Sequence, residues 1–167
     1  MRGLRIAVAL LAAVVLQTLL PGLMVGDTAA LDLVLVAVVY IALTSGPVAG
    51  LLAGTVAGLA QDALSSGILG IGGLAKTVVG FAAGVLGTQF IISAPLPRFL
   101  VFVVATILHA VLYVGLYVAL DLRAFPSPWT AAVTQAVGNG FVGVVALQLS
   151  EWLPGLADRR RARRPRR

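Results

Sequence analysis

Long, uncharged apolar segments dominate this chain and restrict the folds that it can adopt. A transmembrane helix needs about 20 predominantly apolar residues, with a range of roughly 17–25. Segments of about this length occupy residues 4–20, 29–44, 46–65, 72–92, 99–120 and 129–149. Short stretches rich in Pro, Gly, Ser and Asp separate them and are typical of turns. We therefore predict an all-α polytopic membrane protein with six transmembrane helices, in which residues 1–153 form one transmembrane domain.

Composition excludes a soluble globular domain. Hydrophobic residues make up 60% of the chain and charged residues only 11%, and the mean hydropathy is +1.05. Soluble domains average about 45–50% apolar and about 25% charged residues. A soluble chain of roughly 150 residues buries only about 68–70% of its unfolded surface, which is too little to hide this apolar content. The absence of cysteine excludes disulfides and cysteine metal ligands.

The distribution of arginine predicts the orientation in the membrane. With six spans, Arg2, Arg5, Arg98 and the tail at residues 154–167 lie on one side, and Arg123 lies on the other. Basic residues concentrate in the short loops on the cytoplasmic side of a membrane, so we expect both termini to be cytoplasmic. The start of the chain also resembles a signal peptide, but its apolar segment is long for one, and an uncleaved first helix is the favoured interpretation.

The arginine-rich cytoplasmic tail predicts contact with anionic lipid and a role in topology. Its central arginines are Arg159, Arg160, Arg161, Arg163 and Arg164. The tail has no aromatic residues that could stack on bases, so nucleic acid is not an expected partner.

Residues 67–77, GILGIGGLAKT, resemble a phosphate-binding loop. A working loop needs a glycine where this chain has Ala75, and it needs a strand before the loop. Here the glycines join two apolar helices, so we interpret them as a tight turn rather than a nucleotide site.

Lys76 falls within the fourth segment, where an isolated charge costs about 2.5–3.5 kcal/mol on insertion scales. Asp62, near the end of the third segment, is expected at a similar depth in an antiparallel hairpin. We predict an intramembrane ion pair between Asp62 and Lys76. Separate extension of both side chains to the outer interface is the main alternative, and a role in ion translocation is a weaker one.

Small residues recur every four positions in the third and fourth segments. They are Gly50, Gly54, Gly58, Gly80 and Gly84. Such faces let helix backbones approach closely in lipid. The pattern favours packing within the bundle, and a docking face for a partner helix is the alternative.

Polar residues also occur near the centres of the last two segments. His109 is followed at helical spacing by Tyr113 and Tyr117, and Asn139 has Gln135 one turn before it. We predict that His109, Asn139 and Gln135 make hydrogen bonds between helices. The sequence contains no recognisable catalytic or metal-binding motif, so we expect neither enzymatic activity nor a cofactor.

Residues 50–84 resemble the signature region of the MreD family of bacterial rod shape-determining proteins. The shared pattern is a glycine-rich span ending in Gly-Leu-x-x-Asp, a short polar turn, a Leu-Gly pair and a helix containing Gly-Phe. Its members in this chain are Gly54, Gly58, Leu59, Asp62, Leu69, Gly70, Gly80 and Phe81.

This resemblance implies a non-enzymatic scaffold of the cell-elongation complex that supports rod shape and lateral peptidoglycan synthesis. It implies MreC as partner, RodA and its penicillin-binding transpeptidase as further partners, and the MreB filament as an indirect one. The family is similar in fold to the S-components of energy-coupling-factor transporters. A vitamin-binding subunit of such a transporter is therefore the alternative function.

Overall fold

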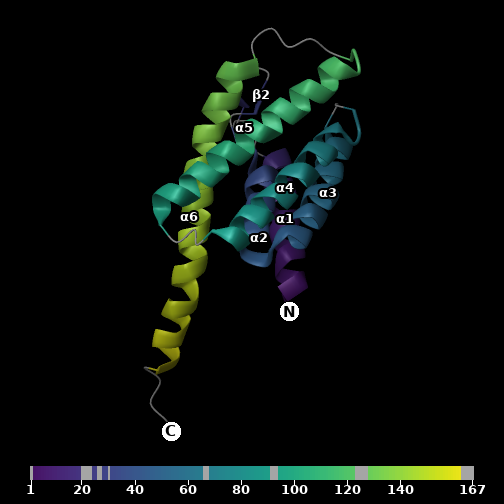
Figure 1. The fold of residues 1–167 in the computed structure, drawn as a ribbon. Coiled ribbons are helices and arrows are strands. Elements are labelled where there is room, and N and C mark those ends of the chain that lie inside the picture. The colour runs from purple at the N-terminus through teal and green to yellow at the C-terminus, as the bar shows by residue number, and fades with distance from the viewer. Residues whose placement is uncertain are drawn as a thin grey trace.

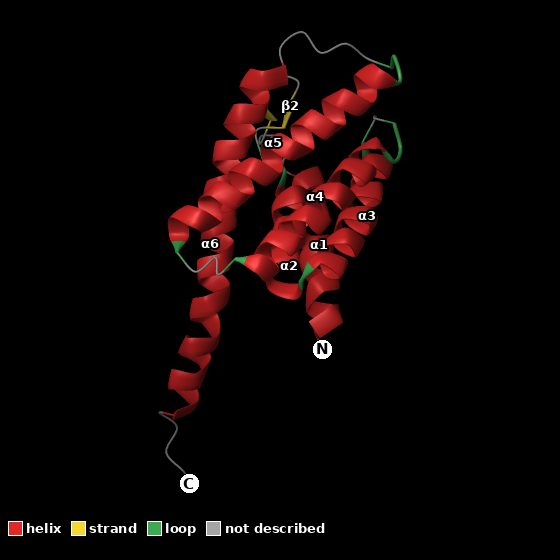
Figure 2. Ribbon diagram, viewed as in Figure 1, coloured by secondary structure: helices red, strands yellow, loops and turns green. Residues whose placement is uncertain are grey.

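The computed structural model describes residues 2–19, 24–25, 28–29, 31–65, 68–90, 94–122 and 128–162. Six helices account for nearly all of them: α1 (Arg2–Leu19), α2 (Leu33–Ser45), α3 (Pro47–Leu64), α4 (Ile71–Gln89), α5 (Pro95–Ala119) and α6 (Pro128–Ala162). Two short strands, β1 (Met24–Val25) and β2 (Thr28–Ala29), pair antiparallel between α1 and α2. Figures 1 and 2 show this helical architecture, which confirms the predicted all-α fold with six helices.

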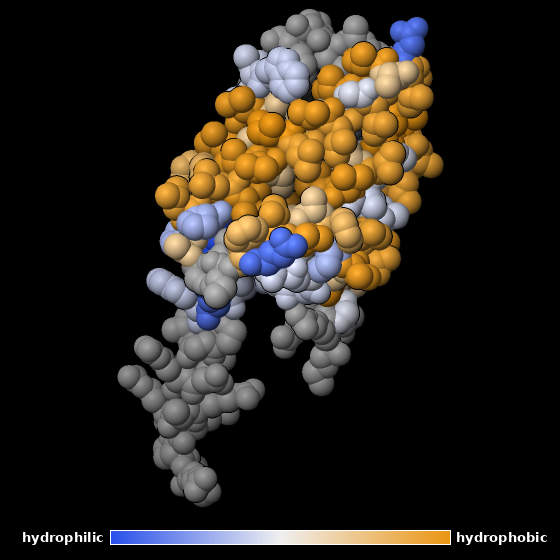
Figure 3. All heavy atoms as spheres, in the orientation of Figure 1, coloured by the Kyte–Doolittle hydropathy of each residue, from blue (hydrophilic) through white to orange (hydrophobic). Residues whose placement is uncertain are grey.

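Four of the helices are long and apolar enough to cross a membrane. These stretches are Pro47–Leu64, Ile71–Gln89, Pro95–Ala119 and Trp129–Trp152. Helices α1 and α2 have shorter apolar stretches, and the 13 residues of α2 extend only about 20 Å against a hydrocarbon thickness of about 30 Å. Orange apolar side chains cover the middle of the face in Figure 3, and hydrophilic ones lie toward its ends. The chain is a membrane protein in which α2 is too short to span alone.

Helix α2 lies at the centre of the bundle. Its residues are buried on every side, which explains why its sequence has no polar face. The buried members are Val34, Leu35, Val36, Val38, Val39, Ile41 and Ala42. On one side they pack with residues of α1 and α3, and on the other with residues of α4, α5 and α6. The core of the protein is therefore built around this one short helix.

Helices α3 and α4 form the closest contact in the bundle, and glycines make it. A Cβ atom placed on Gly50 would lie 2.9 Å from the carbonyl carbon of Gly80, and one on Gly58 would lie 2.6 Å from the Cα of Gly73. A Cβ on Gly54 would lie 2.6 Å from the carbonyl carbon of Lys76. Real Cβ atoms do not approach backbone this closely. The two helices can touch in this way only because these positions have no side chain.

Gly84 completes this glycine interface, since a Cβ there would lie 2.6 Å from the amide nitrogen of Pro47. The glycine faces of α3 and α4 are thus turned toward each other. The alternative that they form a docking face for a partner helix is wrong, because neighbouring backbone already occupies the space in front of them.

Turn geometry accounts for both short connections of the α2–α4 region. Gly46 has φ +91° and joins α2 to α3, which then begins at Pro47. Gly70 has φ +101° and precedes the first residue of α4. Glycine adopts this left-handed region without the strain that a Cβ would cause. Gly70 thus forms the turn predicted from the sequence, and Gly72 and Gly73 are among the first residues of α4; Gly67 lies outside the described residues.

Candidate functional site

Lys76 forms a buried ion pair with Asp32. The ammonium nitrogen lies 2.8 Å from Oδ2 of Asp32, and the two side chains are only 4% and 6% exposed. Asp32 is also the N-cap residue of α2, where its Oδ1 accepts a hydrogen bond of 2.8 Å from the amide of Leu35. Both carboxylate oxygens are therefore used, one to start a helix and one to balance the charge of the lysine.

The predicted pair between Asp62 and Lys76 is corrected by this finding. Asp62 Oδ2 accepts hydrogen bonds of 2.9 Å from the amides of Gly70 and Gly73, at the start of α4. Its carboxylate therefore closes the α3–α4 turn and satisfies free amides of the helix N-terminus. A similar depth in the hairpin does not bring the two side chains into contact, because Lys76 faces α2 and α5 while Asp62 faces the turn.

Non-helical backbone reaches the interior just before Asp32. Gln17 on α1 holds it, since its Nε2 donates to the carbonyl of Leu31 at 3.0 Å and its Oε1 accepts from the amide of Leu33 at 2.8 Å. Backbone outside a helix is tolerated within a membrane only where its polar groups are satisfied by protein or water. This arrangement allows α2 to begin inside the bundle rather than at its surface.

His109 of α5 lies against the same lysine. Its Nε2 is 3.2 Å from the ammonium nitrogen of Lys76. An ammonium group can only donate, so the imidazole nitrogen accepts, and this contact requires the neutral tautomer protonated on Nδ1. The ring stacks on Tyr113 with centroids 5.9 Å apart, and Tyr113 lies next to Tyr117 at 4.9 Å.

Asn139 of α6 connects the ion pair to α5 by a second route. Its Oδ1 accepts from the backbone amide of Asp32 at 3.0 Å, and its Nδ2 donates to Oγ1 of Thr106 at 3.2 Å. Thr106 in turn donates to the carbonyl of Phe102 at 2.8 Å. The side chain of Asn139 is fully buried, so each of these bonds replaces one with water.

These contacts form a chain of side chains from His109 to Thr106 that closes only through the backbone of α5, to which both residues belong, and we call it the polar ring. Its members are Asp32, Lys76, His109, Thr106 and Asn139, contributed by α2, α4, α5 and α6. The ring contains one anion and one cation and is neutral overall. Hydrogen-bonded groups of this kind fix the relative positions of helices in lipid, where apolar contacts alone specify little.

Lys76, His109 and Asn139 were predicted as polar groups inside the bundle, and the structure brings all three together. Their partners Asp32 and Thr106 were not predicted. A usable signal was present for Asp32, because an aspartate directly before an apolar segment is a common N-cap. Thr106 carries no comparable signal, since threonine often bonds to the carbonyl four residues before it in a helix.

The other predicted positions lie apart from the ring. Gln135 is partly buried on α6, one turn from Asn139. Arg98, at the start of α5, forms a two-bond ion pair with Glu151 of α6, with one nitrogen–oxygen distance of 3.0 Å. Residues 159–161 lie in the last part of the α6 helix, and Arg163 and Arg164 lie outside the described residues.

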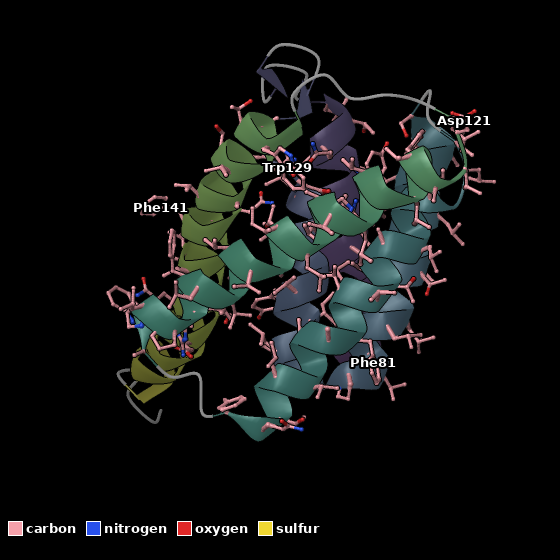
Figure 4. The ribbon with its side chains drawn as sticks, turned by 45° about the horizontal axis from the view of Figure 1, so that its top comes forward. Phe81, Asp121, Trp129 and Phe141 are labelled. Atoms are coloured by element: carbon pink, nitrogen blue, oxygen red, sulfur yellow. The ribbon has the colours of Figure 1, made fainter. Side chains whose placement is uncertain are left out.

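Within the described ranges, no group of three or more His, Cys, Asp or Glu side chains is placed to hold a metal ion. A vitamin site, which the alternative function requires, would need a few polar or aromatic side chains that converge on the ligand. Asp32 points inward to Lys76, and Trp129 lies at the start of α6, 54% exposed (Figure 4). Asp27 and Arg123 lie outside the described residues.

The fold and the polar ring define a multi-pass helical membrane protein whose central helices are joined by a buried, neutral polar network. The family model described as rod shape-determining protein MreD matches residues 1–145 of the chain. The chain therefore belongs to the MreD family and is a rod shape-determining membrane protein. No curated protein and no solved structure matches it. The likeness to transporter S-components stays a prediction.

Proposed function

We propose that this protein is a scaffold of the bacterial cell-elongation complex that binds MreC and, with it, RodA and its transpeptidase. The observation that carries the proposal is the family match over residues 1–145, which includes the whole α1–α5 region and most of the membrane part of α6. In this role the protein contributes to lateral peptidoglycan synthesis by holding partners together, and it carries out no reaction itself. In this proposal the protein contacts the MreB filament only indirectly, through MreC.

The arrangement of the helices supports the proposed orientation in the cell membrane. The first residues of α1 and the last residues of α6 lie at the same end of the bundle (Figure 1). Helix α6 has 35 residues and is about 52 Å long, so it extends beyond a hydrocarbon layer of about 30 Å. We infer that this end is cytoplasmic and that the basic tail contacts anionic lipid there.

Partner helices in this proposal contact the outward faces of the bundle. The glycine faces of α3 and α4 are occupied by each other, so they hold the scaffold together and do not receive a partner. The outward positions carry large apolar side chains, among them Phe81 on α4 and Phe141 on α6, which point away from the bundle in Figure 4 and are 46% and 63% exposed.

Co-purification tests the proposal. The tagged protein is extracted in mild detergent together with co-expressed MreC, and MreC is expected in the eluate at a fixed ratio. A matched variant replaces the five central tail arginines with glutamine. We expect it to retain MreC and to lose binding to vesicles that contain phosphatidylglycerol. Absence of MreC from a monodisperse, folded preparation of the unaltered protein would contradict the scaffold proposal.

A further inference from the structure

The six helices divide into two groups with different kinds of internal contact. The first group is α1–α4, in which α3 and α4 share the largest interface and α2 packs on both. The second group is the α5–α6 hairpin, which has the next largest interface. The seam between the groups is formed mainly by α4 with α5 and by α2 with α6. Both of these contacts are smaller than those that α2, α3 and α4 make with one another.

Each group is held together by contacts that do not involve the seam. In the hairpin, Phe99 and Phe102 fill the space beside Gly140 and Gly143, respectively. Arg98 pairs with Glu151 of the same hairpin. In the first group, the close approach of the α3 and α4 backbones holds these two helices together. Each group therefore has its own specific packing.

The polar ring crosses the seam twice. One crossing is the hydrogen bond from the amide of Asp32 to Asn139, and the other is the contact between Lys76 and His109. The remaining two links of the ring, Asp32 with Lys76 and Asn139 with Thr106, stay within one group. Lys76 could therefore keep its counter-ion if the hairpin moved, and Asn139 could keep Thr106.

Apolar contacts at the seam contribute little specific attraction in a membrane. Phe102 and Leu147 of the hairpin pack against Leu35, Val39 and Val79. Lipid chains can replace such contacts at small cost, because they are as apolar as the side chains. Polar groups left without partners in lipid cannot be compensated in this way. The two ring bonds are thus the contacts across the seam whose loss is most costly.

We propose that the polar ring is a latch between the α1–α4 group and the α5–α6 hairpin, and that breaking its seam bonds lets the hairpin move as a unit. A third seam bond, from the amide of Ile68 to the hydroxyl of Tyr117, lies farther along α5 and acts as a second attachment point. Movement is then expected to be largest at the end of the hairpin away from Tyr117, where α5 begins and α6 continues beyond the bundle.

Two substitutions at one position test the latch. His109→Leu removes the acceptor for Lys76 but leaves the ion pair with Asp32, so the lysine stays neutralised. His109→Gln supplies an amide oxygen that can accept the same bond. Both variants lose the ring stack on Tyr113, so a difference between them reports the seam bond and not the stacking.

Distances between spin labels measure the position of the hairpin. The chain has no cysteine, so labels can be attached at introduced cysteines without removing any. Val56 on α3 and Val145 on α6 are exposed and span the seam. Two exposed pairs serve as references within the groups. Val8 on α1 and Val56 on α3 report on the α1–α4 group, and Val104 on α5 and Val145 on α6 report on the hairpin.

We expect the seam pair to show a displaced population about tenfold larger in His109→Leu than in His109→Gln, since a hydrogen bond to a charged group contributes a factor of at least this order. Both reference pairs should keep narrow, unchanged distributions. Equal seam distributions in the two variants would overturn the latch. Simultaneous broadening of all three pairs in His109→Leu would also overturn it, because the ring would then hold the whole fold rather than one seam.

Discussion

The pairing of Lys76 with Asp32 gives the sharpest test of the structure. Lys76→Met keeps most of the length of the side chain and removes its charge, which leaves the Asp32 carboxylate buried without a cation. Asp32→Asn keeps an oxygen for the N-cap of α2 and removes the negative charge. Both side chains are almost fully buried, at 4% and 6% exposure, so solvent cannot compensate for the loss of either partner.

Removing one member of a buried ion pair costs about 3–5 kcal/mol, whereas replacing both members is far less costly. We expect each single variant to lose about this much free energy of unfolding. The double variant should cost no more than either single variant, so its loss should fall below the sum of the two by about 3 kcal/mol or more, as expected for residues in direct contact. A loss of several kcal/mol is a large part of the 5–15 kcal/mol stability of an ordinary protein, so the single variants should also give lower folded yields.

The assay is reversible unfolding in detergent micelles, followed by tryptophan fluorescence, for the unaltered protein, both single variants and the double variant. These four proteins form a double-mutant cycle. The control is a second such cycle, in which Asp62→Asn replaces Asp32→Asn. Asp62 bonds to the amides of Gly70 and Gly73, so its substitution should add to that of Lys76 without coupling. Additive losses in the Asp32 cycle, or coupling in the Asp62 cycle, would refute the pairing.

Three further predictions concern backbone approach and capping. Gly54→Leu should abolish folding, because a side chain at this position would meet the backbone of α4. Gly115→Leu should fold normally, because nothing lies within 4 Å of a Cβ atom at that position. Size-exclusion profiles in detergent distinguish the two outcomes. Asp62→Ala should cost about 1–2 kcal/mol through loss of its bonds to the start of α4, measured by thermal unfolding. Asp121, just after α5, has φ +52°, a left-handed conformation that glycine adopts without strain and valine does not. Asp121→Gly should therefore be neutral or stabilising, and Asp121→Val should cost about 1 kcal/mol or more. Equal melting temperatures of the two variants would contradict this expectation.

The helices were predictable because lipid imposes a simple requirement on length and polarity. Some apolar segments end at residues that interrupt a helix, such as Gly46 before Pro47 at the α2–α3 turn. The small-residue faces of α3 and α4 were also visible in the sequence. Whether they bind each other or a partner could not be decided from the sequence, because both interfaces need the same close approach of backbones.

The correct partner of Lys76 could not be predicted from segment boundaries. A span drawn from hydropathy places Asp32 near a membrane surface, whereas in the structure α2 begins within the bundle and carries Asp32 to the level of Lys76. That position depends on Gln17 and Asn139, which satisfy the backbone around residue 32 from two other helices. Such a tertiary arrangement has no signature in any one segment.

Depletion of the protein in its own bacterium, followed by microscopy, tests most directly whether the protein supports rod shape. Cells that lose it are expected to become round and swollen. A plasmid copy of the unaltered protein should restore rods, and a Gly54→Leu copy, which cannot form the α3–α4 contact, should not. Depleted cells that keep their shape but require an added vitamin for growth would contradict the account and favour a transporter subunit.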